Sequence, residues 1–343
     1  MELSNAIIFV LQAYGLNPSE FSVERIDSGH INYTYKVEPG YILQRINKNV
    51  FLRPQVLSQN LKVASSYLKQ NAPDYLFLHA INATSGEDLV FDKEGYPWRL
   101  FPYFKNTITI NEVDTPQQAY SAARAFGLLS RHLSGCDVSK LEETIPRFHD
   151  LSLRYQQFKE SLSKASDERK HLAHDLIDKY VHYDYLVNRY QSLVHGNRMH
   201  LRITHNDTKI NNVLFERGTD KVVCVIDLDT LMPGYFLYDL GDMIRTFVSP
   251  ASEEETEFSK IKIRKEIYQA IIDGYLSEMD SILTIEEKLL IPLAGSIMTY
   301  MIGLRFLTDF LNGDTYYQTS YLHQNMNRAA NQLYLLELLE SQA

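Results

Sequence analysis

A short β-rich stretch inside a long helical region constrains this chain most. Residues 201–215 read LRITHNDTKINNVLF, residues 221–229 read KVVCVIDLD, and a turn pattern lies between them at 217–220. Helical patterns precede this stretch from about residue 115 and follow it from Tyr238 to the end. Such a β island predicts short strands whose connecting loops hold polar side chains in fixed positions.

The first loop of the island carries a carboxylate and an amide at a defined spacing. Leu201 and Ile203 lie on the strand that leads into it, and Asp207 and Asn212 are five residues apart. A loop of this length can aim a carboxylate at a substrate hydroxyl and an amide oxygen at a metal ion.

The second strand of the island ends in two acidic residues. Asp227 and Asp229 are separated by one residue, so strand alternation puts both on one face if the strand continues. Carboxylates at a strand end suit Mg²⁺, which takes one or two carboxylates together with phosphate oxygens. Alone, each motif is typical of turns or helix caps. Both motifs in this order, about 15 residues apart, favour a metal-assisted site.

The first hundred residues have a different texture from the rest. Strand patterns with turn signals occur at 21–26, 34–37, 41–46, 74–81, 88–91 and 97–104, and a helical pattern begins at Pro54. We therefore expect an N-terminal lobe over residues 1–104, an antiparallel sheet carrying one helix. Residues 105–343 are expected to form a larger helical lobe, so the predicted fold class is α+β.

Composition excludes several classes of protein. The 343 residues carry 34 Lys and Arg against 43 Asp and Glu, a net charge of −9, which disfavours nucleic-acid binding by bulk charge. Two cysteines are too few for a disulfide framework and indicate a reducing, cytoplasmic setting. The N-terminus lacks the basic start of a signal peptide. No apolar stretch is expected to reach the roughly 18 residues that span a bilayer, so no membrane partner is predicted.

The island resembles the catalytic and metal loops of the aminoglycoside phosphotransferase and choline kinase superfamily, whose layout protein kinases share. The finer resemblance is to N-acetylhexosamine 1-kinases. It rests on five segments: SGHIN at 28–32, YILQRIN at 41–47, THNDTKINNV at 204–213, VIDLDTLMPG at 225–234 and YDLGD at 238–242. The late helix with Gly303, Leu304 and Arg305 extends it. The resemblance implies a two-lobed, protein-kinase-like fold.

The resemblance also implies roles for the island's residues. Asp207 would accept the proton of the attacking hydroxyl, or at least orient it. Asn212 and Asp227 would hold Mg²⁺ bridging the phosphates of ATP. Asp229 has three possible roles, as a metal ligand, as support for one, or as a contact to the acceptor. Asp239 would support the metal loop from the start of a helix, and His205 would orient its own loop.

The N-terminal lobe should cover the nucleotide. The loop Ser28-Gly29-His30-Ile31-Asn32 lies between two strands, where backbone N–H groups can face phosphate oxygens. Kinases place a Lys on the third strand, and here Arg45 is the cation available, although a shift of one residue would put Gln44 there instead. Pro102 and Tyr103 fit either a lobe connector that pairs with adenine or an ordinary core strand.

The acceptor should bind in the helical lobe. Arg305 is a single cation within the apolar helix at 291–311, so it either pairs with Asp309 four residues on or binds acceptor oxygens. Tyr316 follows a turn that can place its ring against a sugar. The predicted function is an ATP- and Mg²⁺-dependent kinase acting on the anomeric hydroxyl of an N-acetylhexosamine. Alternatives are a kinase of choline, homoserine or an aminoglycoside, or a non-catalytic nucleotide-binding module. The sequence does not indicate an oligomeric state.

Overall fold

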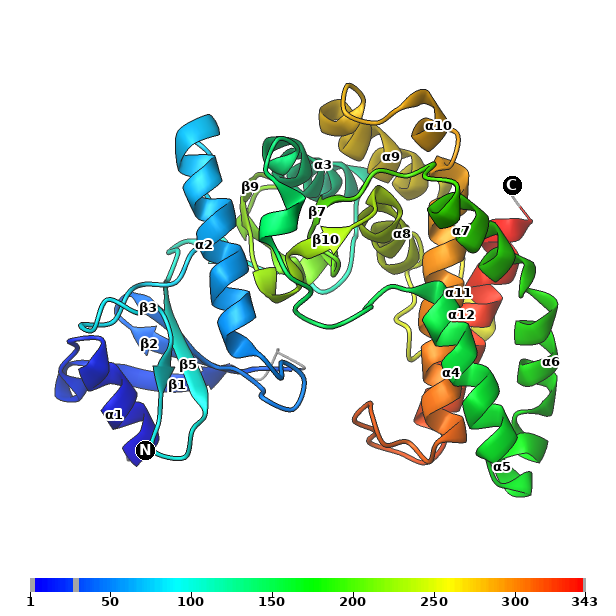
Figure 1. Cartoon of the computed structure of the whole chain (residues 1–343), viewed down its shortest axis with the longest axis horizontal. Coiled ribbons are helices and arrows are strands. Elements are labelled where there is room, and N and C mark those ends of the chain that lie inside the picture. The colour runs from blue at the N-terminus through cyan, green and yellow to red at the C-terminus, as the bar shows by residue number, and fades with distance from the viewer. Residues whose placement is uncertain (1–3, 27–30, 342–343) are drawn as a thin grey trace.

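The computed structural model describes residues 4–26 and 31–341 and has two lobes. The smaller lobe contains one antiparallel sheet with the strand order β1-β2-β3-β5-β4 (Figure 1). Its elements are α1 (Asn5–Ala13), β1 (Ser22–Ile26), β2 (Tyr33–Glu38), β3 (Tyr41–Arg45), α2 (Pro54–Asn71), β4 (Val90–Phe91) and β5 (Pro97–Pro102). One face of the sheet packs on α1, and Leu43, Trp98 and Leu100 are buried there.

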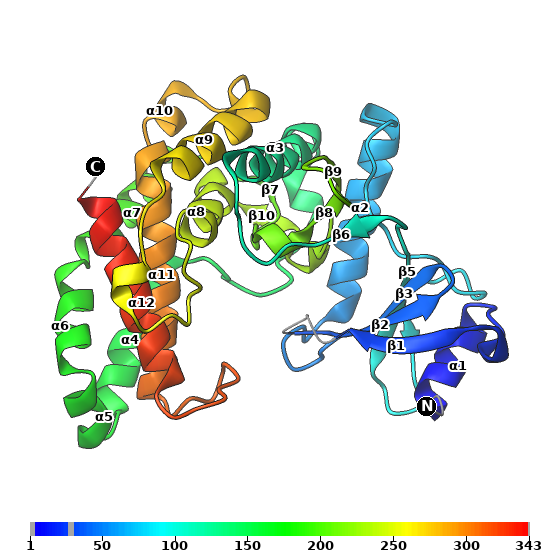
Figure 2. The ribbon, with the colours of Figure 1, turned by 180° about the vertical axis from the view of Figure 1, so that it is seen from behind.

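The larger lobe is mainly helical and carries the β island on the side that faces α2, as both views of the ribbon show (Figure 2). Its helices are α3 (Pro116–Leu133), α4 (Leu151–Lys164), α5 (Asp167–Leu172), α6 (His174–His182), α7 (Tyr185–His195), α8 (Phe236–Phe247), α9 (Lys265–Met279), α10 (Ile285–Lys288), α11 (Ile291–Leu311) and α12 (Gln324–Glu340). Its strands are β6 (Thr107–Ile108), β7 (Arg202–Thr204), β8 (Val213–Glu216), β9 (Val222–Val225) and β10 (Met232–Gly234).

The helix α11 forms the centre of the helical lobe and packs on α4, α8 and α12. Of the described residues, only this helix is long and apolar enough to cross a bilayer, which corrects the expectation that no stretch would reach that length. Its apolar window is 83% buried inside the lobe. That burial is typical of the core helix of a folded domain, whose side chains are covered by protein on all sides.

The α+β prediction with a small antiparallel lobe and a larger helical lobe is confirmed. The prediction of a strand at 74–81 is wrong, because this segment contributes only one isolated bridge, between Ile81 and Leu100. Its apolar residues pack without a regular strand partner. The polar region that follows α4 forms three short helices, α5, α6 and α7.

Candidate active site

The loop that connects β7 to β8, here named the catalytic loop, is held by hydrogen bonds between side chains and main-chain groups. Asn206 adopts a left-handed conformation with φ 64°, which Asn tolerates better than most residues. Its side-chain amide donates to the carbonyls of Thr204, Thr230 and Met232, at 3.1, 3.0 and 3.3 Å. These bonds tie the loop to the segment that follows the metal loop.

A glycine on β10 allows this close approach. A Cβ atom at Gly234 would lie 2.1 Å from Thr204 Oγ1 and 2.7 Å from Asn206 Oδ1, both far inside contact distance. A side chain at this position would therefore push β10 away from the catalytic loop.

Two acidic residues of α8 bind backbone N–H groups of the catalytic loop. Asp239 accepts the backbone N–H of His205 at 3.0 Å and that of Asn206 at 2.7 Å, and Asp242 accepts that of Thr208 at 2.9 Å. Burial raises the pKa of Asp239 to about 6, although the hydrogen bonds from the backbone N–H groups lower it in part. The predicted support role of Asp239 thus falls on the catalytic loop and not on the metal loop, because the N–H groups within reach belong to residues 205 and 206.

Asp207 lies among groups that favour its charged form. Lys209 Nζ is 3.3 Å from its Oδ1, and the amide of Asn212 donates to its Oδ2 at 3.0 Å. Burial opposes ionisation, but the charge of Lys209 and the hydrogen bond from Asn212 together hold the pKa of Asp207 below its usual range. Because Asn212 uses its nitrogen for this bond and for the Asp207 carbonyl at 2.8 Å, its side-chain oxygen remains as a possible metal ligand.

Asp227 follows β9 in a left-handed conformation, with φ 55° and ψ 55°. The residue is exposed to solvent. Partial desolvation of its carboxyl group, together with the charges of Asp229 and Asp207, raises the pKa of Asp227 to about 7. The charges of Asp229 and Asp207 thus disfavour ionisation of Asp227, and a divalent cation bound beside it would relieve this repulsion.

Asp229 connects the two lobes. Its carboxylate lies 2.5 Å from Arg99 Nη2 of β5 and accepts the side-chain amide of Asn32 at 2.7 Å. It is 3% exposed and Arg99 is equally buried. Of the three roles left open for Asp229, this arrangement matches support of the metal loop, since both carboxylate oxygens already contact the N-terminal lobe.

The side chain of Arg45 lies on the face of the sheet away from the metal loop, which argues against its predicted role as the strand cation. The guanidinium of Arg45 stacks over Tyr33 and Tyr96, 4.2 and 4.7 Å from the ring centroids. Gln44, one residue earlier, points to the other face of the sheet and accepts Arg99 Nη2 at 2.8 Å. Strand alternation therefore turns Arg45 away from the metal loop, and Arg99, the cross-strand neighbour of Gln44, is the cation on the face toward Asp229.

The residues of the loop at 28–32, which are predicted to bind the nucleotide, differ in the polar groups that they have available. Ser28, Gly29 and His30 lie outside the described residues. Ile31 is exposed, and both polar ends of Asn32 are occupied, since its oxygen accepts the Asn47 N–H at 3.0 Å.

Residues 102 and 103, the predicted connector between the lobes, take part in the N-terminal sheet. Tyr103 donates its N–H to the carbonyl of Gly40 at 2.9 Å, and Pro102 has no N–H. The main chain of residues 102 and 103 can therefore offer an adenine ring only carbonyl oxygens, because its donors are used or absent.

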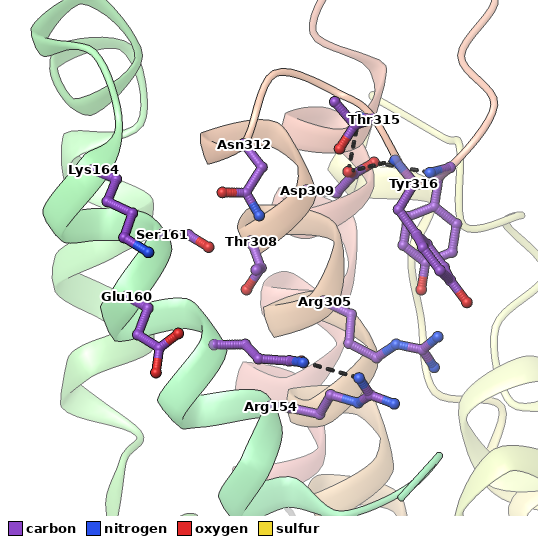
Figure 3. Close-up of a pocket in the computed structure, with 12 residues that line it drawn as sticks. Arg154, Glu160, Ser161, Lys164, Arg305, Thr308, Asp309, Asn312, Thr315 and Tyr316 are labelled. Carbon is purple, nitrogen blue, oxygen red and sulfur yellow. Dashed lines mark hydrogen bonds between the residues drawn. The ribbon is translucent and has the colours of Figure 1, made fainter. Parts of the chain in front are cut away.

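A polar cavity of about 450 Å³ opens between α4, α11 and the loop after α11 (Figure 3). Arg154 of α4 and Arg305 of α11 lie side by side at one end, next to the rings of Tyr316 and Tyr317. Burial, and after it the charge of Arg305, lower the pKa of Arg154 to about 10. Arg154 is committed to the protein, since it donates to the carbonyl of Phe148 at 2.8 Å and to Gln157 at 3.0 Å.

Arg305 has no hydrogen bond or ion pair within residues 4–26 and 31–341. Its guanidinium stacks on Phe148 at 4.9 Å, Tyr317 at 5.7 Å and Tyr316 at 6.0 Å from the ring centroids. The alternative pairing with Asp309 is not formed. Asp309 instead accepts the backbone N–H groups of residues 315, 316 and 317 at 3.0, 2.8 and 2.9 Å. The donors of Arg305 thus remain available to a ligand in the cavity.

Sequence reasoning missed Arg99, His149 and Arg154. Arg99 carried the same signal that identified Arg305, because it is a single charged residue in an apolar segment, WRLFPYF. His149 and Arg154 gave no such signal, since both lie in a polar stretch that resembles any exposed helix start.

Comparison with known proteins identifies the family and the fold of the chain. The family model described as the phosphotransferase enzyme family matches residues 22–279. The fold is similar to a microcompartment-associated aminopropanol kinase (TM-score 0.60, 16% identity, 97% of this chain and 95% of that chain). It is also similar to an amicoumacin kinase bound to AMP-PNP and Ca²⁺ (0.63, 15%, 99% and 94%) and to an ethanolamine kinase of Plasmodium vivax (0.61, 16%, 100% and 93%).

The matched region contains the catalytic loop, the metal loop and the N-terminal sheet from β1 onward. It is 258 residues long out of 343, counted from 22 to 279, and so covers most of the chain. The chain therefore belongs to the phosphotransferase enzyme family.

Proposed function

We propose that this phosphotransferase transfers a phosphoryl group from Mg-ATP to the anomeric hydroxyl of an N-acetylhexosamine. The observation that carries the acceptor class is Arg305, an unpaired guanidinium stacked on three aromatic rings in a polar cavity. A guanidinium fork binds two neighbouring oxygens at once, and aromatic rings pack well against the C–H face of a sugar.

The metal-binding role fits the donors present. No group of three His, Cys, Asp or Glu side chains in the described part of the chain forms a closed metal centre. Mg²⁺ in nucleotide sites needs only one or two protein ligands beside phosphate oxygens, which Asn212 and Asp227 can supply. Bound Mg²⁺ would neutralise charge on the transferred phosphoryl group. Asp207, ionised and held by Lys209 and Asn212, would accept the hydrogen bond and then the proton of the acceptor hydroxyl.

Arg99 is proposed as the cation that contacts the ATP phosphates from the N-terminal lobe. Its Nε and Nη2 are bound to Gln44 and Asp229, so Nη1 is the end available to phosphate oxygens. We expect Arg99→Gln to raise the ATP KM at least tenfold, about 1.4 kcal/mol of lost contact. Steady-state ATP titration measures this effect.

Arg45→Gln is the matched control for this experiment, because it removes the same charge from the opposite face of the sheet. Its ATP KM should stay within about threefold of wild type, since a surface cation–π contact contributes only ~0.5–1 kcal/mol. Melting curves check both variants, because Asp229 loses a buried partner in Arg99→Gln. The reverse ranking of the two variants would return the phosphate contact to Arg45.

Charge separates the proposed acceptor from the amine-bearing alternatives. The structural neighbours include kinases described as acting on aminopropanol and ethanolamine, which makes a small amino alcohol the second candidate. Two guanidinium groups share one end of the cavity here, and the carboxylate of Asp309 is occupied by backbone donors. A cationic amine placed beside Arg305 would meet like charge, which favours a neutral acetamido sugar at this end of the cavity, whereas the carboxylate of Glu160 lines another part of it.

The deciding experiment is a kinase assay with Mg-ATP across a panel of acceptors. N-Acetylglucosamine and N-acetylgalactosamine test the proposal, and glucosamine differs from the former only by the loss of the acetyl group and the gain of a charge. Choline, ethanolamine, homoserine and an aminoglycoside test the alternatives. Turnover of an amino alcohol with none of either acetamido sugar would contradict the sugar assignment. Absence of turnover with every acceptor would favour the non-catalytic alternative.

Arg305→Lys tests the acceptor contact directly. Lysine keeps the charge but cannot hold two oxygens in a planar fork, so we expect the sugar KM to rise roughly tenfold or more. The ATP KM should barely change, because Arg305 lies on α11 and Arg99 lies on the other lobe. Paired titrations of sugar and ATP measure the two constants.

Arg169→Lys provides the matched control. Arg169 lies near the same end of α11 and is structural, since it pairs with Asp314 at 2.8 Å. Its replacement should lower the melting temperature slightly and leave the sugar KM unchanged. An unchanged sugar KM in well-folded Arg305→Lys would assign Arg305 a structural role.

A further inference from the structure

The peptide unit between Asn206 and Asp207 is held from both ends by imidazole rings. His149 Nε2 lies 2.8 Å from the carbonyl oxygen of Asn206. The N–H of Asp207, at the other end of the same peptide plane, donates to His205 Nδ1 at 3.2 Å. Because a peptide unit is planar, these two bonds together fix the direction in which the Asp207 side chain leaves the backbone.

The bonds define the protonation of both rings. His205 accepts at Nδ1, so its proton lies on Nε2, which donates to the carbonyl of Ile226 at 3.0 Å. His149 faces a carbonyl with Nε2 and must donate there. Burial lowers the pKa of His149 to about 3, in agreement with a neutral ring that acts as a fixed donor.

His149 is itself held rigidly outside the catalytic loop. It precedes α4 and is 5% exposed, and its ring lies between Phe148 at 4.2 Å and Tyr238 at 5.1 Å, centroid to centroid. The hydroxyl of Tyr238 is 2.6 Å from that of Tyr190. Arg154 anchors the backbone on the other side through the carbonyl of Phe148. The ring therefore cannot follow the loop if the loop moves.

A purely structural role explains this histidine less well. Its Nδ1 is buried without a hydrogen-bond partner in the described residues, although buried polar groups are usually paired. An apolar ring of similar size would fill the space between Phe148 and Tyr238 without that unpaired atom. The single bond that the imidazole makes goes to the residue immediately before Asp207.

We infer that His149 is a positioning residue for the reaction, acting on Asp207 through the Asn206–Asp207 peptide. The inference rests on the proposed role of Asp207. Loss of the His149 donor frees the carbonyl end of the peptide, and Asp207 then samples orientations that do not face the acceptor hydroxyl. A misplacement of about 1 Å can reduce turnover by about 10²-fold, so the effect should appear in kcat and leave substrate affinity alone.

The test compares two pairs of variants with the best acceptor of the panel. His149→Leu removes the donor and should lower kcat by roughly 10- to 100-fold, with the KM values for ATP and acceptor within about threefold. His149→Gln can place an amide N–H near the position of Nε2 and should recover most of kcat. His149→Asn is too short to reach the carbonyl and should behave like leucine. This second pair keeps the comparison valid if the leucine variant folds poorly.

Two further variants serve as controls in this experiment. His132→Leu removes a half-buried histidine in the last turn of α3, whose ring lies 5.0 Å from that of Tyr75, outside the catalytic loop, so its kcat should equal that of wild type. Asp207→Asn, measured alongside, separates the two hypotheses. An inactive Asp207→Asn with wild-type kcat in His149→Leu overturns only the inference, and so do equal losses in the Gln and Asn variants. A fully active Asp207→Asn overturns the role of Asp207 itself.

Discussion

Replacing Asp207 by asparagine should reduce turnover by ~10²–10⁴-fold, the usual contribution of a positioned base. Asparagine keeps the size of the side chain and can still contact Asn212, so the loop should keep its shape. ATP affinity should remain near that of wild type, because Arg99 and Asp227, and not Asp207, are proposed to contact the nucleotide and its metal. Steady-state kinetics and calorimetric titration with Mg-ATP measure the two quantities.

Asp175→Asn is a suitable control for this experiment, since its side chain is fully exposed on α6. It makes the same chemical change at a surface position and should leave kcat untouched. If Asp207→Asn turned over within about twofold of wild type, the base would have to be sought elsewhere in the chain.

Asp227→Asn should abolish metal-dependent nucleotide binding, the second large effect. The metal would lose its anionic ligand while the phosphates kept their charge, so the affinity for Mg-ATP should fall at least tenfold. Asparagine is preferred to alanine because position 227 is left-handed, with φ 55°, and Asn tolerates that conformation far better than a residue without a polar side chain.

Titrations of Asp227→Asn with ATP, in the presence and absence of Mg²⁺, isolate the metal contribution. Wild type should bind much more tightly with the ion, and the variant should show nearly equal affinities under both conditions. An affinity that still rises with Mg²⁺ as in wild type would show that other groups hold the ion.

The catalytic and metal loops could be predicted because each lies within one short segment. Asp207 and Asn212 are five residues apart and Asp227 ends the next strand but one, so local spacing alone brings them into one region. The division into lobes was equally visible, since strand and helix periodicities differ along the chain. The segment at 74–81 shows where this fails, because an apolar run with β-like composition forms only one bridge to a neighbouring strand.

Contacts between distant segments could not be predicted. Asn32 and Asp229 are 197 residues apart, and no local pattern relates them. The choice between Gln44 and Arg45 depended on which face of the sheet each side chain occupies, and a shift of one residue reverses that answer. Arg305 and Asp309 have the spacing of a helical ion pair, yet the carboxylate is taken by backbone donors that lie beyond the end of the helix.

The attachment of the loop after α11 to Asp309 has a consequence for how acceptor preference can diverge. The carboxylate binds three main-chain N–H groups in succession, and these are the same whatever side chains residues 315–317 carry. Tyr316 and Tyr317 can therefore be substituted while the loop keeps its backbone conformation. A library varied at these two positions, with Asp309 kept, should yield folded proteins that differ in the acceptors they use. The same library built on Asp309→Ala should lose that tolerance.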